Sequence, residues 1–468
     1  MLINIINNKL INTLKQFLNS KWMMFLIVAA AAISNLFGLE IITYYIYTGI
    51  IIFTILFNEA MLPLFPIPCV AYMTFAKRNN PLSVEKTSTF LHNSSAIHML
   101  IIGITISIFV IPRIIHDIVK NKDRRKMPKL LYGFIALGLS YILGGIFSKA
   151  YGFRTAFFGL VEILTLSFTY FCFYFTVDWK KVDKNYFPLL FTTIGFLMVV
   201  EVLNMLIEGG FFSTIGEFSR GNLYTGWGHY NNVGGICVLT IPAPFYFACT
   251  KKNGFLYSLI GTLFLLFTIL TQSRNSMLMG SIIYCICALI TLIKSEKKEK
   301  IKHLITYSIL LTSIIVIMIL FKERIMDMFS SIYNVGTDDN GRIEIYKDGL
   351  TQFKDYPIFG NGFYECKAFQ WGVTTENTFI PPRYHNTYIQ ILASCGIVGI
   401  ITYLYHRYQT IKLFYKNKDL NSIFIMITLL GLILIGFLDC HFHNLGPGFI
   451  YSALLLLAEK VYYKKDTL

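Results

Sequence analysis

The sequence predicts an all-α protein that crosses a membrane many times, and two observations predict this class. Hydrophobic residues make up 55% of the 468 residues and charged residues only 14%, whereas soluble chains carry about 25% charged residues. Apolar runs of about 20 residues recur along the chain, and each is long enough to cross a hydrocarbon layer about 30 Å thick. A backbone inside lipid must satisfy its own hydrogen bonds, so these runs are expected to be helices.

The apolar runs predict about 12 to 14 transmembrane helices. In order, they are Trp22–Asn35, Ile41–Phe57, Met61–Ala76, Ile97–His116, Leu130–Phe147, Phe153–Val177, Phe187–Ile207, Val233–Thr250, Phe255–Leu270, Met277–Ile293, His303–Phe321, Thr387–Tyr405, Ser422–Leu438 and Pro447–Ala458. The third is short and contains three prolines, so it is expected to be broken or re-entrant.

The net charge of +15 is distributed in short clusters of Lys and Arg between the apolar runs. This distribution is typical of cytoplasmic loops in membrane proteins and argues against a nucleic-acid partner. The strongest cluster lies between Lys120 and Lys129, and another begins at Arg407. These clusters predict that both chain termini are cytoplasmic. The nine cysteines show no metal-ligand spacing and no disulfide framework.

The orientation divides the chain into three parts: helices in residues 1–321, a large extracytoplasmic loop in 322–386, and further helices in 387–468. A loop this long is usually functional in a compact protein. Within it, Ile343, Tyr346, Leu350 and Phe353 recur at spacings of three and four. This spacing predicts an amphipathic helix that ends before Tyr356-Pro357.

Three residues on the predicted outer side carry suitable chemistry: Arg220, Arg274 and His385. Arginine is always charged, and its planar guanidinium fits phosphate oxygens. Histidine exchanges a proton near neutral pH. Two fixed cations and one proton carrier at a single membrane face suit a diphosphate substrate attacked by a hydroxyl group. Taken singly, Arg274 is equally consistent with a contact to lipid headgroups, and His385 with a helix-entry position.

Other polar residues support weaker interpretations. The segment DCHFHN, with His441 and His443, contains one carboxylate and two histidines, which is a weak metal-site signal. Asp338 and Asp339 are more typical of a solvated turn than of an acid–base pair. Carboxylates within apolar runs are costly and functional by default. Glu201 lies near the outer end of its predicted helix and is expected to face the same site, whereas the sequence assigns no role to the deeper Glu162.

The order of four motifs resembles the family of O-antigen ligases and O-antigen polymerases. These motifs are Arg220-Gly221 ahead of Asn231-Asn232, the turn Ser273-Arg274, Gly341-Arg342 followed by PIFGNG, and His385-Asn386 ahead of Gly396-Ile397-Val398-Gly399. Where the family usually has Pro-Asn at the helix start, this chain has Tyr230-Asn231-Asn232. The motifs lie between Arg220 and Tyr403, and the similarity in topology extends over the full length.

The resemblance implies an inverting, lipid-linked glycosyltransferase that is built only from helices and needs no metal or cofactor. In that family, the arginines matching Arg220 and Arg274 are thought to hold the diphosphate of an undecaprenyl-linked glycan. The histidine matching His385 is thought to activate the acceptor hydroxyl. Five further residues are predicted to contact substrate: Arg342, Asn386, Tyr230, Asn231 and Tyr384.

The sequence thus predicts a polymerase that joins undecaprenyl-diphosphate-linked repeat units into a capsule, exopolysaccharide or O-antigen-type polymer, at the outer face of a bacterial cytoplasmic membrane. The expected partners are the glycan donor, the acceptor, membrane lipids and a chain-length regulator or flippase. Frequent Ile, Asn, Lys and Tyr are typical of AT-rich bacteria, many without an outer membrane, and this bias favours a polymerase over a ligase.

Three alternatives remain. A ligase would transfer the glycan to a different acceptor. A transporter or flippase would be expected to carry polar residues along its helix midplanes and internal repeats, whereas the polar residues of interest here gather on one predicted face. A structural assembly protein would leave the two arginines and the histidine unexplained.

Overall fold

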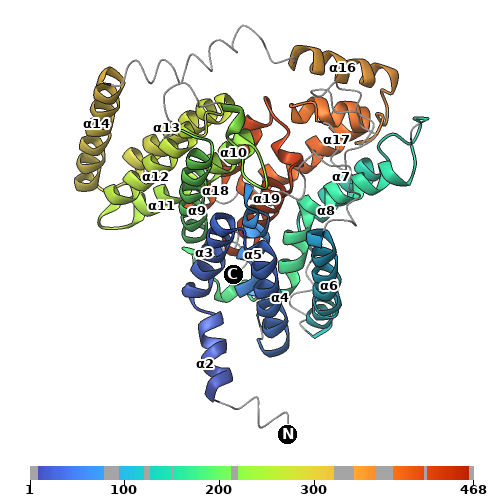
Figure 1. Ribbon diagram of the computed structural model, residues 1–468, viewed down its shortest axis with the longest axis horizontal. Helices are drawn as coiled ribbons and strands as arrows, with labels where there is room; N and C mark the ends of the chain where they lie inside the picture. Colours follow the sequence, from blue (N-terminus) through green and yellow to red (C-terminus); the bar gives the residue numbers. More distant parts are fainter. Residues whose placement is uncertain are drawn as a thin grey trace.

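The computed structural model describes residues 9–58, 60–77, 94–120, 127–149, 151–211, 220–320, 342–363, 383–415 and 419–462, and the regular elements in these ranges are all helical (Figure 1). The α-helices are α2 (Lys9–Leu18), α3 (Lys21–Phe37), α4 (Glu40–Phe57), α5 (Pro66–Val70), α6 (Ser94–Lys120), α7 (Leu131–Ile142), α8 (Phe153–Thr176), α9 (Tyr186–Glu208), α10 (Tyr230–Thr240), α11 (Pro242–Thr250), α12 (Gly254–Leu270), α13 (Arg274–Lys294), α14 (Lys297–Leu320), α16 (Arg342–Asp355), α17 (Thr387–Tyr415), α18 (Leu420–Ile435) and α19 (Leu445–Leu457). Short turns of helix are η1 (Leu62–Leu64), η2 (Ala71–Thr74), η6 (Trp179–Lys181), η7 (Arg220–Asn222), η9 (His441–His443) and η10 (Ala458–Tyr462).

The helices confirm the predicted class of an all-α polytopic membrane protein. Among the described residues, seven spans are long and apolar enough to cross a membrane, and the bent pair α2 and α3 makes an eighth. Four shorter apolar helical segments, in Leu62–Thr74, Leu131–Ile142, Gly254–Leu270 and Leu420–Ile435, coincide with other predicted crossings. A span needs about 20 residues when it runs straight across a bilayer.

The centre of the bundle is the pair α10 and α11, which packs against α9, α12, α13 and α18. Small residues let the neighbours approach the α10 backbone closely. A Cβ atom on Gly235 would lie 2.2 Å from the ring of His441, and one on Gly234 would lie 2.6 Å from Ser276 Oγ. Pro242 starts α11, because proline lacks the amide hydrogen that would continue α10.

The segment between α4 and α6 is broken, as its prolines predict. It forms η1, α5 and η2 in place of one continuous helix. Side chains at the end of α3 satisfy backbone carbonyls that the broken segment leaves open: Ser34 Oγ donates to Thr74 O over 2.9 Å, and Asn35 Nδ2 donates to Phe75 O over 2.9 Å. Such compensation lets non-helical backbone lie within a helical bundle.

Contacts between distant segments agree with the predicted arrangement of the ends. Lys21 forms an ion pair with Asp183 over 3.1 Å, and the sequence places both on the inner side. Lys77 Nζ donates to Asn222 O over 2.8 Å, and the sequence places both on the outer side. The helices between them therefore run from one end of the bundle to the other.

The helix predicted within the large loop is α16, which ends at Asp355, just before Tyr356-Pro357. It packs against α17, and Figure 1 shows both at the same corner of the molecule. The α17 helix is interrupted at Gly396, whose φ of 63° and ψ of −156° are not helical. This interruption leaves carbonyls open, and Ala393 O accepts from Asn361 N while Ser394 O accepts from Gly362 N, each over 2.9 Å. The GNG motif and the interrupted helix therefore form one packed unit.

The structure places Arg407 within a helix, where the sequence analysis expected a loop. The basic cluster that begins there was taken as a cytoplasmic loop, but α17 continues to Tyr415 and Arg407 is buried inside it. Its guanidinium lies 4.6–4.9 Å from the ring centres of Tyr403, Phe442 and Tyr451. An aromatic face attracts a cation, and this attraction offsets part of the cost of burying the charge. The position of Arg407 in the sequence did not predict that this residue is buried in the core.

Candidate functional site

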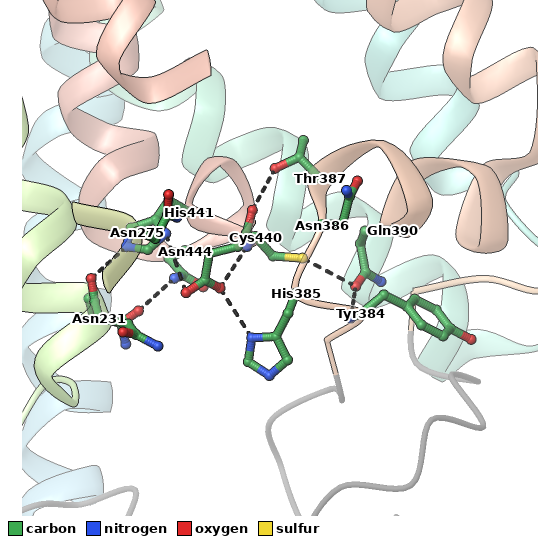
Figure 2. A network of polar contacts seen from close by, with 12 residues as sticks. Asn231, Asn275, Tyr384, His385, Asn386, Thr387, Gln390, Cys440, His441 and Asn444 are labelled. Atoms are coloured by element: carbon green, nitrogen blue, oxygen red, sulfur yellow. Dashed lines mark hydrogen bonds and ion pairs between the residues drawn. The ribbon is translucent and has the colours of Figure 1, made fainter. Parts of the chain in front are cut away.

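The ends of several helices that are distant in sequence meet at one place (Figure 2). Asn231 lies in the first turn of α10, Asn275 lies in the first turn of α13, His385 precedes α17, His441 lies in η9 and Asn444 precedes α19. Hydrogen bonds join these ends: His441 Nε2 lies 2.9 Å from Asn231 O, and Asn444 Nδ2 donates to Asn232 Oδ1 over 3.0 Å. The cluster is therefore assembled by the tertiary fold and is absent from any single stretch of sequence.

The backbone around His385 is held in an uncommon conformation. His385 has a φ of 50°, in the left-handed region that residues other than glycine rarely adopt. The next residue, Asn386, caps α17, since its Oδ1 accepts from Tyr388 N over 2.9 Å and from Ile389 N over 3.0 Å. Tyr346 of α16 donates its hydroxyl to His385 O over 3.1 Å. These contacts fix the turn and leave the imidazole to project from it (Figure 2).

The His385 imidazole is paired with a buried carboxylate. Its Nδ1 lies 3.3 Å from Asp439 Oδ1, and its Nε2 makes no hydrogen bond within the described part of the chain. A carboxylate at Nδ1 favours the tautomer with the proton on Nδ1. The Nε2 lone pair is then free to take a proton from a bound hydroxyl group, which is the arrangement of a general base with an orienting partner.

Asp439 is buried, yet its surroundings keep it ionised. Burial by itself would raise the pKa of this carboxyl, but the imidazoles of His441, His385 and His229 outweigh burial and hold the pKa well below its usual range. Cys440 N also donates to Asp439 Oδ1 over 2.7 Å. The sequence analysis noted this carboxylate only within the weak metal signal of DCHFHN. The sequence feature that could have indicated Asp439 is its position directly after an apolar run, on the predicted outer side.

The two histidines of DCHFHN face different partners. His441 lies against Asn231 O, with its Nδ1 3.8 Å from Asp439 Oδ2, whereas His443 Nδ1 lies 3.3 Å from Glu162 Oε2. Within the described ranges, no three His, Cys, Asp or Glu side chains are grouped as they would be around a metal ion. In this structure the segment contributes a carboxylate partner to His385.

Arg274 lies at the start of α13, directly after its N-cap Ser273. Its neighbour Asn275 donates Nδ2 to Ile435 O over 3.0 Å, and the same carbonyl accepts from Asp439 N over 3.0 Å. The turn that carries Arg274 is therefore joined to the turn that carries Asp439. The Arg274 side chain is half-buried and forms no hydrogen bond or ion pair with the described residues. This leaves a guanidinium available for an anion at a helix N-terminus, where the helix dipole also favours negative charge.

Arg342 also lies near the turn of His385. It begins α16, and its charge acts on the hydroxyl of Tyr346, which donates to His385 O. Burial raises the pKa of Tyr346, and Asp439 raises it further, whereas Arg342 lowers it. Tyr346 thus links the turn of His385 to the helix that Arg342 begins. This placement is consistent with the substrate contact predicted for Arg342.

The loop that carries Arg220 is attached to the bundle, although the Arg220 side chain lies outside the described residues. Its backbone forms η7 with Asn222, whose carbonyl accepts from Lys77 Nζ, and Lys77 also lies 3.9 Å from the ring centre of Tyr224. Trp227 Nε1 donates to the buried Glu201 Oε2 over 2.6 Å. Glu201 therefore faces this loop, and convergence of Arg220 on the site stays a prediction.

The predicted substrate-contact residues differ in their positions. Tyr384 is fully buried and donates its hydroxyl to Gln352 of α16, and its contact with a sugar stays a prediction. Asn386 serves as the cap of α17. Asn231 is buried and presents its carbonyl to His441, while Tyr230 is half-buried beside His229. Of these four, Tyr230 and Asn386 are partly exposed.

The fold and the site together define a polytopic helical membrane protein with a histidine–carboxylate pair and an available arginine at converging helix ends. Residues 259–404 match the family model described as O-antigen ligase. The match confirms the predicted resemblance and supports a membrane glycosyltransferase of the ligase or polymerase type. It covers Arg274, Arg342 and His385, whereas Arg220 and Asp439 lie outside it. A search of curated proteins found no match to the chain.

Proposed function

We propose that this protein polymerises lipid-linked oligosaccharides at the outer face of a bacterial cytoplasmic membrane. The observation that carries the proposal is the pairing of His385 with the ionised Asp439, on a turn that shares the Ile435 carbonyl with the turn of Arg274. The family match supports a glycosyltransferase, and the available guanidinium supports an anionic leaving group such as a prenyl diphosphate.

The chemistry is a single displacement at the anomeric carbon of the donor sugar. An acceptor hydroxyl oxygen forms a bond to this carbon while the bond from the carbon to the diphosphate oxygen breaks, which inverts the configuration. The hydroxyl proton passes to His385 Nε2, and the charge that develops on the leaving diphosphate is stabilised by Arg274 and, as predicted, by Arg220. Asp439 stabilises the imidazolium that results.

The test is the length of the polymer in cells whose only copy carries His385→Ala at the normal protein level. We expect the long polymer to disappear and the lipid-linked repeat unit to accumulate, as seen by electrophoresis and mass spectrometry. A matched control is His98→Ala, since His98 contacts Tyr45 on α4 and lies outside the site. Long polymer in the His385→Ala strain would rule out the proposed enzyme and favour a transporter or an assembly protein.

The acceptor distinguishes a polymerase from a ligase. Purified protein would be supplied with donor glycolipid extracted from cells that lack this chain, with no other acceptor present. A polymerase is expected to produce lipid-linked dimers and longer products, because donor and acceptor are then the same molecule. A ligase would leave the donor unchanged until a different acceptor is added.

A further inference from the structure

A second polar cluster lies beside the site and includes a carboxylate to which the sequence assigned no role. Glu162 is buried within α8, and both of its carboxylate oxygens are used. Oε1 lies 2.5 Å from Arg383 Nη2, and Oε2 lies 3.3 Å from His443 Nδ1. Arg383 Nη2 also donates to His443 O over 3.0 Å. We call Glu162, Arg383 and His443 the Glu162 junction.

The Glu162 junction connects the two chain segments that carry the histidine and its carboxylate partner. Arg383 lies two residues before His385, and His443 lies four residues after Asp439. Each partner of Glu162 is therefore joined to one member of the pair by a few residues of irregular backbone. The His385–Asp439 contact also receives support from Thr387 Oγ1, which donates to Asp439 O over 3.2 Å, but α8 reaches both segments through Glu162.

Aromatic side chains pack against the junction. Aromatic rings of Tyr141 and Phe363 lie 5.8 Å and 5.3 Å from the ring of His443. A carboxylate buried in an apolar bundle is expensive unless it is paired and hydrogen-bonded, and replacing such pairs with apolar residues often stabilises a protein. The net contribution of such a junction to the free energy of unfolding is therefore small. Its geometry suggests a second role, which is to set the position of the two attached segments.

We infer that Glu162 is a positioning residue that holds His385 and Asp439 at the distance the transfer reaction requires. The inference rests on the proposed function. A carboxylate with two oxygens sets the separation of Arg383 and His443, and through them the separation of the two segments. A displacement of about 1 Å between catalytic groups is enough to lower a rate about 100-fold.

The test compares Glu162→Gln with the double variant Glu162→Gln, Arg383→Gln, using donor glycolipid extracted from cells that lack the enzyme. Glu162→Gln leaves the half-buried Arg383 charge without its carboxylate, so we expect both a lower melting temperature in detergent and a lower kcat. The double variant removes that charge and is expected to regain much of the melting temperature. We expect kcat of both variants to stay about 10- to 100-fold below the wild type, with KM within about threefold.

A matched control is Glu459→Gln. Glu459 is a buried carboxylate that accepts from Tyr170 of the same helix α8 and from Lys129 N, away from His385 and Asp439. We expect this variant to lose melting temperature while it keeps its kcat. If the double variant regains kcat together with melting temperature, the junction serves stability alone and the inference is wrong. If Glu162→Gln does not accumulate in cells, the kcat and melting temperature of the double variant alone test the inference.

The same assay separates this inference from the proposed function. His385→Ala measured beside these variants is expected to be inactive. An inactive His385→Ala with a fully active double variant overturns the positioning role and leaves the proposed function standing. An active His385→Ala removes the proposed function itself.

Discussion

The pairing of His385 with Asp439 determines which nitrogen of the imidazole is available for reaction. The carboxylate lies 3.3 Å from Nδ1, and the positive φ of His385 directs the side chain out of the turn. A strained backbone conformation of this kind costs about 1–3 kcal/mol and persists only where neighbouring contacts enforce it. Here those contacts come from Tyr346 and from the cap that Asn386 forms.

Asp439→Asn tests the contribution of the carboxylate at the residue scale. The amide keeps the size of the side chain but removes the charge that stabilises an imidazolium, so we expect kcat to fall about 100-fold or more, with little change in KM. Asp183→Asn is the control, because Asp183 is an exposed carboxylate whose partner is Lys21. Turnover with the extracted donor glycolipid measures the effect, and an unchanged kcat in Asp439→Asn would show that His385 acts without its partner.

At the scale of elements, the interrupted helix α17 depends on glycine at defined positions. Gly360 has a φ of 66°, and a Cβ atom there would lie 2.3 Å from Ser394 C and 2.4 Å from Cys395 N. The close approach lets the segment after α16 supply hydrogen-bond donors to the interruption at Gly396. Gly360 of the GNG motif is therefore explained by packing against α17, and Gly362 by its close approach to Thr155 of α8.

Gly360→Ala is expected to destabilise the protein by at least about 1–3 kcal/mol, because alanine both clashes with α17 and disfavours a positive φ. Thermal unfolding of the purified protein in detergent is the measurement. Gly49→Ala provides the contrast, since no atom lies within 4 Å of a Cβ at that position in α4. Alanine favours a helix over glycine by about 1 kcal/mol, so this control is expected to unfold at the same temperature or higher. Equal melting temperatures for the two variants would contradict the packing explanation.

The elements were largely predictable from sequence, and the contacts at their ends were not. The spacing of Ile343, Tyr346 and Leu350 predicted α16, and the prolines near Pro66 predicted the broken segment. Periodicity reports which face of a helix is apolar, but it carries no information about which helix ends meet. The partners Asp439 and Glu162 therefore emerged only from the fold.

The chemistry of each residue type also limited which site residues could be predicted from the sequence. Few other residue types perform the chemistry of arginine and histidine, and for this reason the sequence analysis selected Arg274 and His385 on the predicted outer side. Tyrosine serves both in packing and in sugar binding, so the residue type of Tyr384 did not predict that its side chain is fully buried. Arg407 was misassigned because the interruption of α17 at Gly396 is a tertiary feature.

At the scale of the whole molecule, the predicted orientation places α16 outside the cell and the segment between α13 and α14 inside. Lys347 on α16 and Lys298 on α14 are both exposed, so cysteine at either position is accessible to a reagent on its own side. In a background with Cys285 and Cys366 replaced by serine, a membrane-impermeant maleimide is expected to label Lys347→Cys in intact cells.

Lys298→Cys is expected to react only after the cells are permeabilised. The two positions serve as controls for each other, because they share residue type and exposure and differ in predicted side. Labelling of Lys298→Cys in intact cells, with protection of Lys347→Cys, would reverse the orientation and place the site on the cytoplasmic face.

The close approach of His441 to α10 has an evolutionary consequence. The imidazole occupies the volume that any side chain at position 235 would need, with 2.2 Å between its ring and a Cβ on Gly235. A lineage that acquires alanine at 235 must therefore shrink or redirect residue 441, which also faces Asp439. Two positions that are far apart in the chain should consequently change together, and related sequences would show this joint variation.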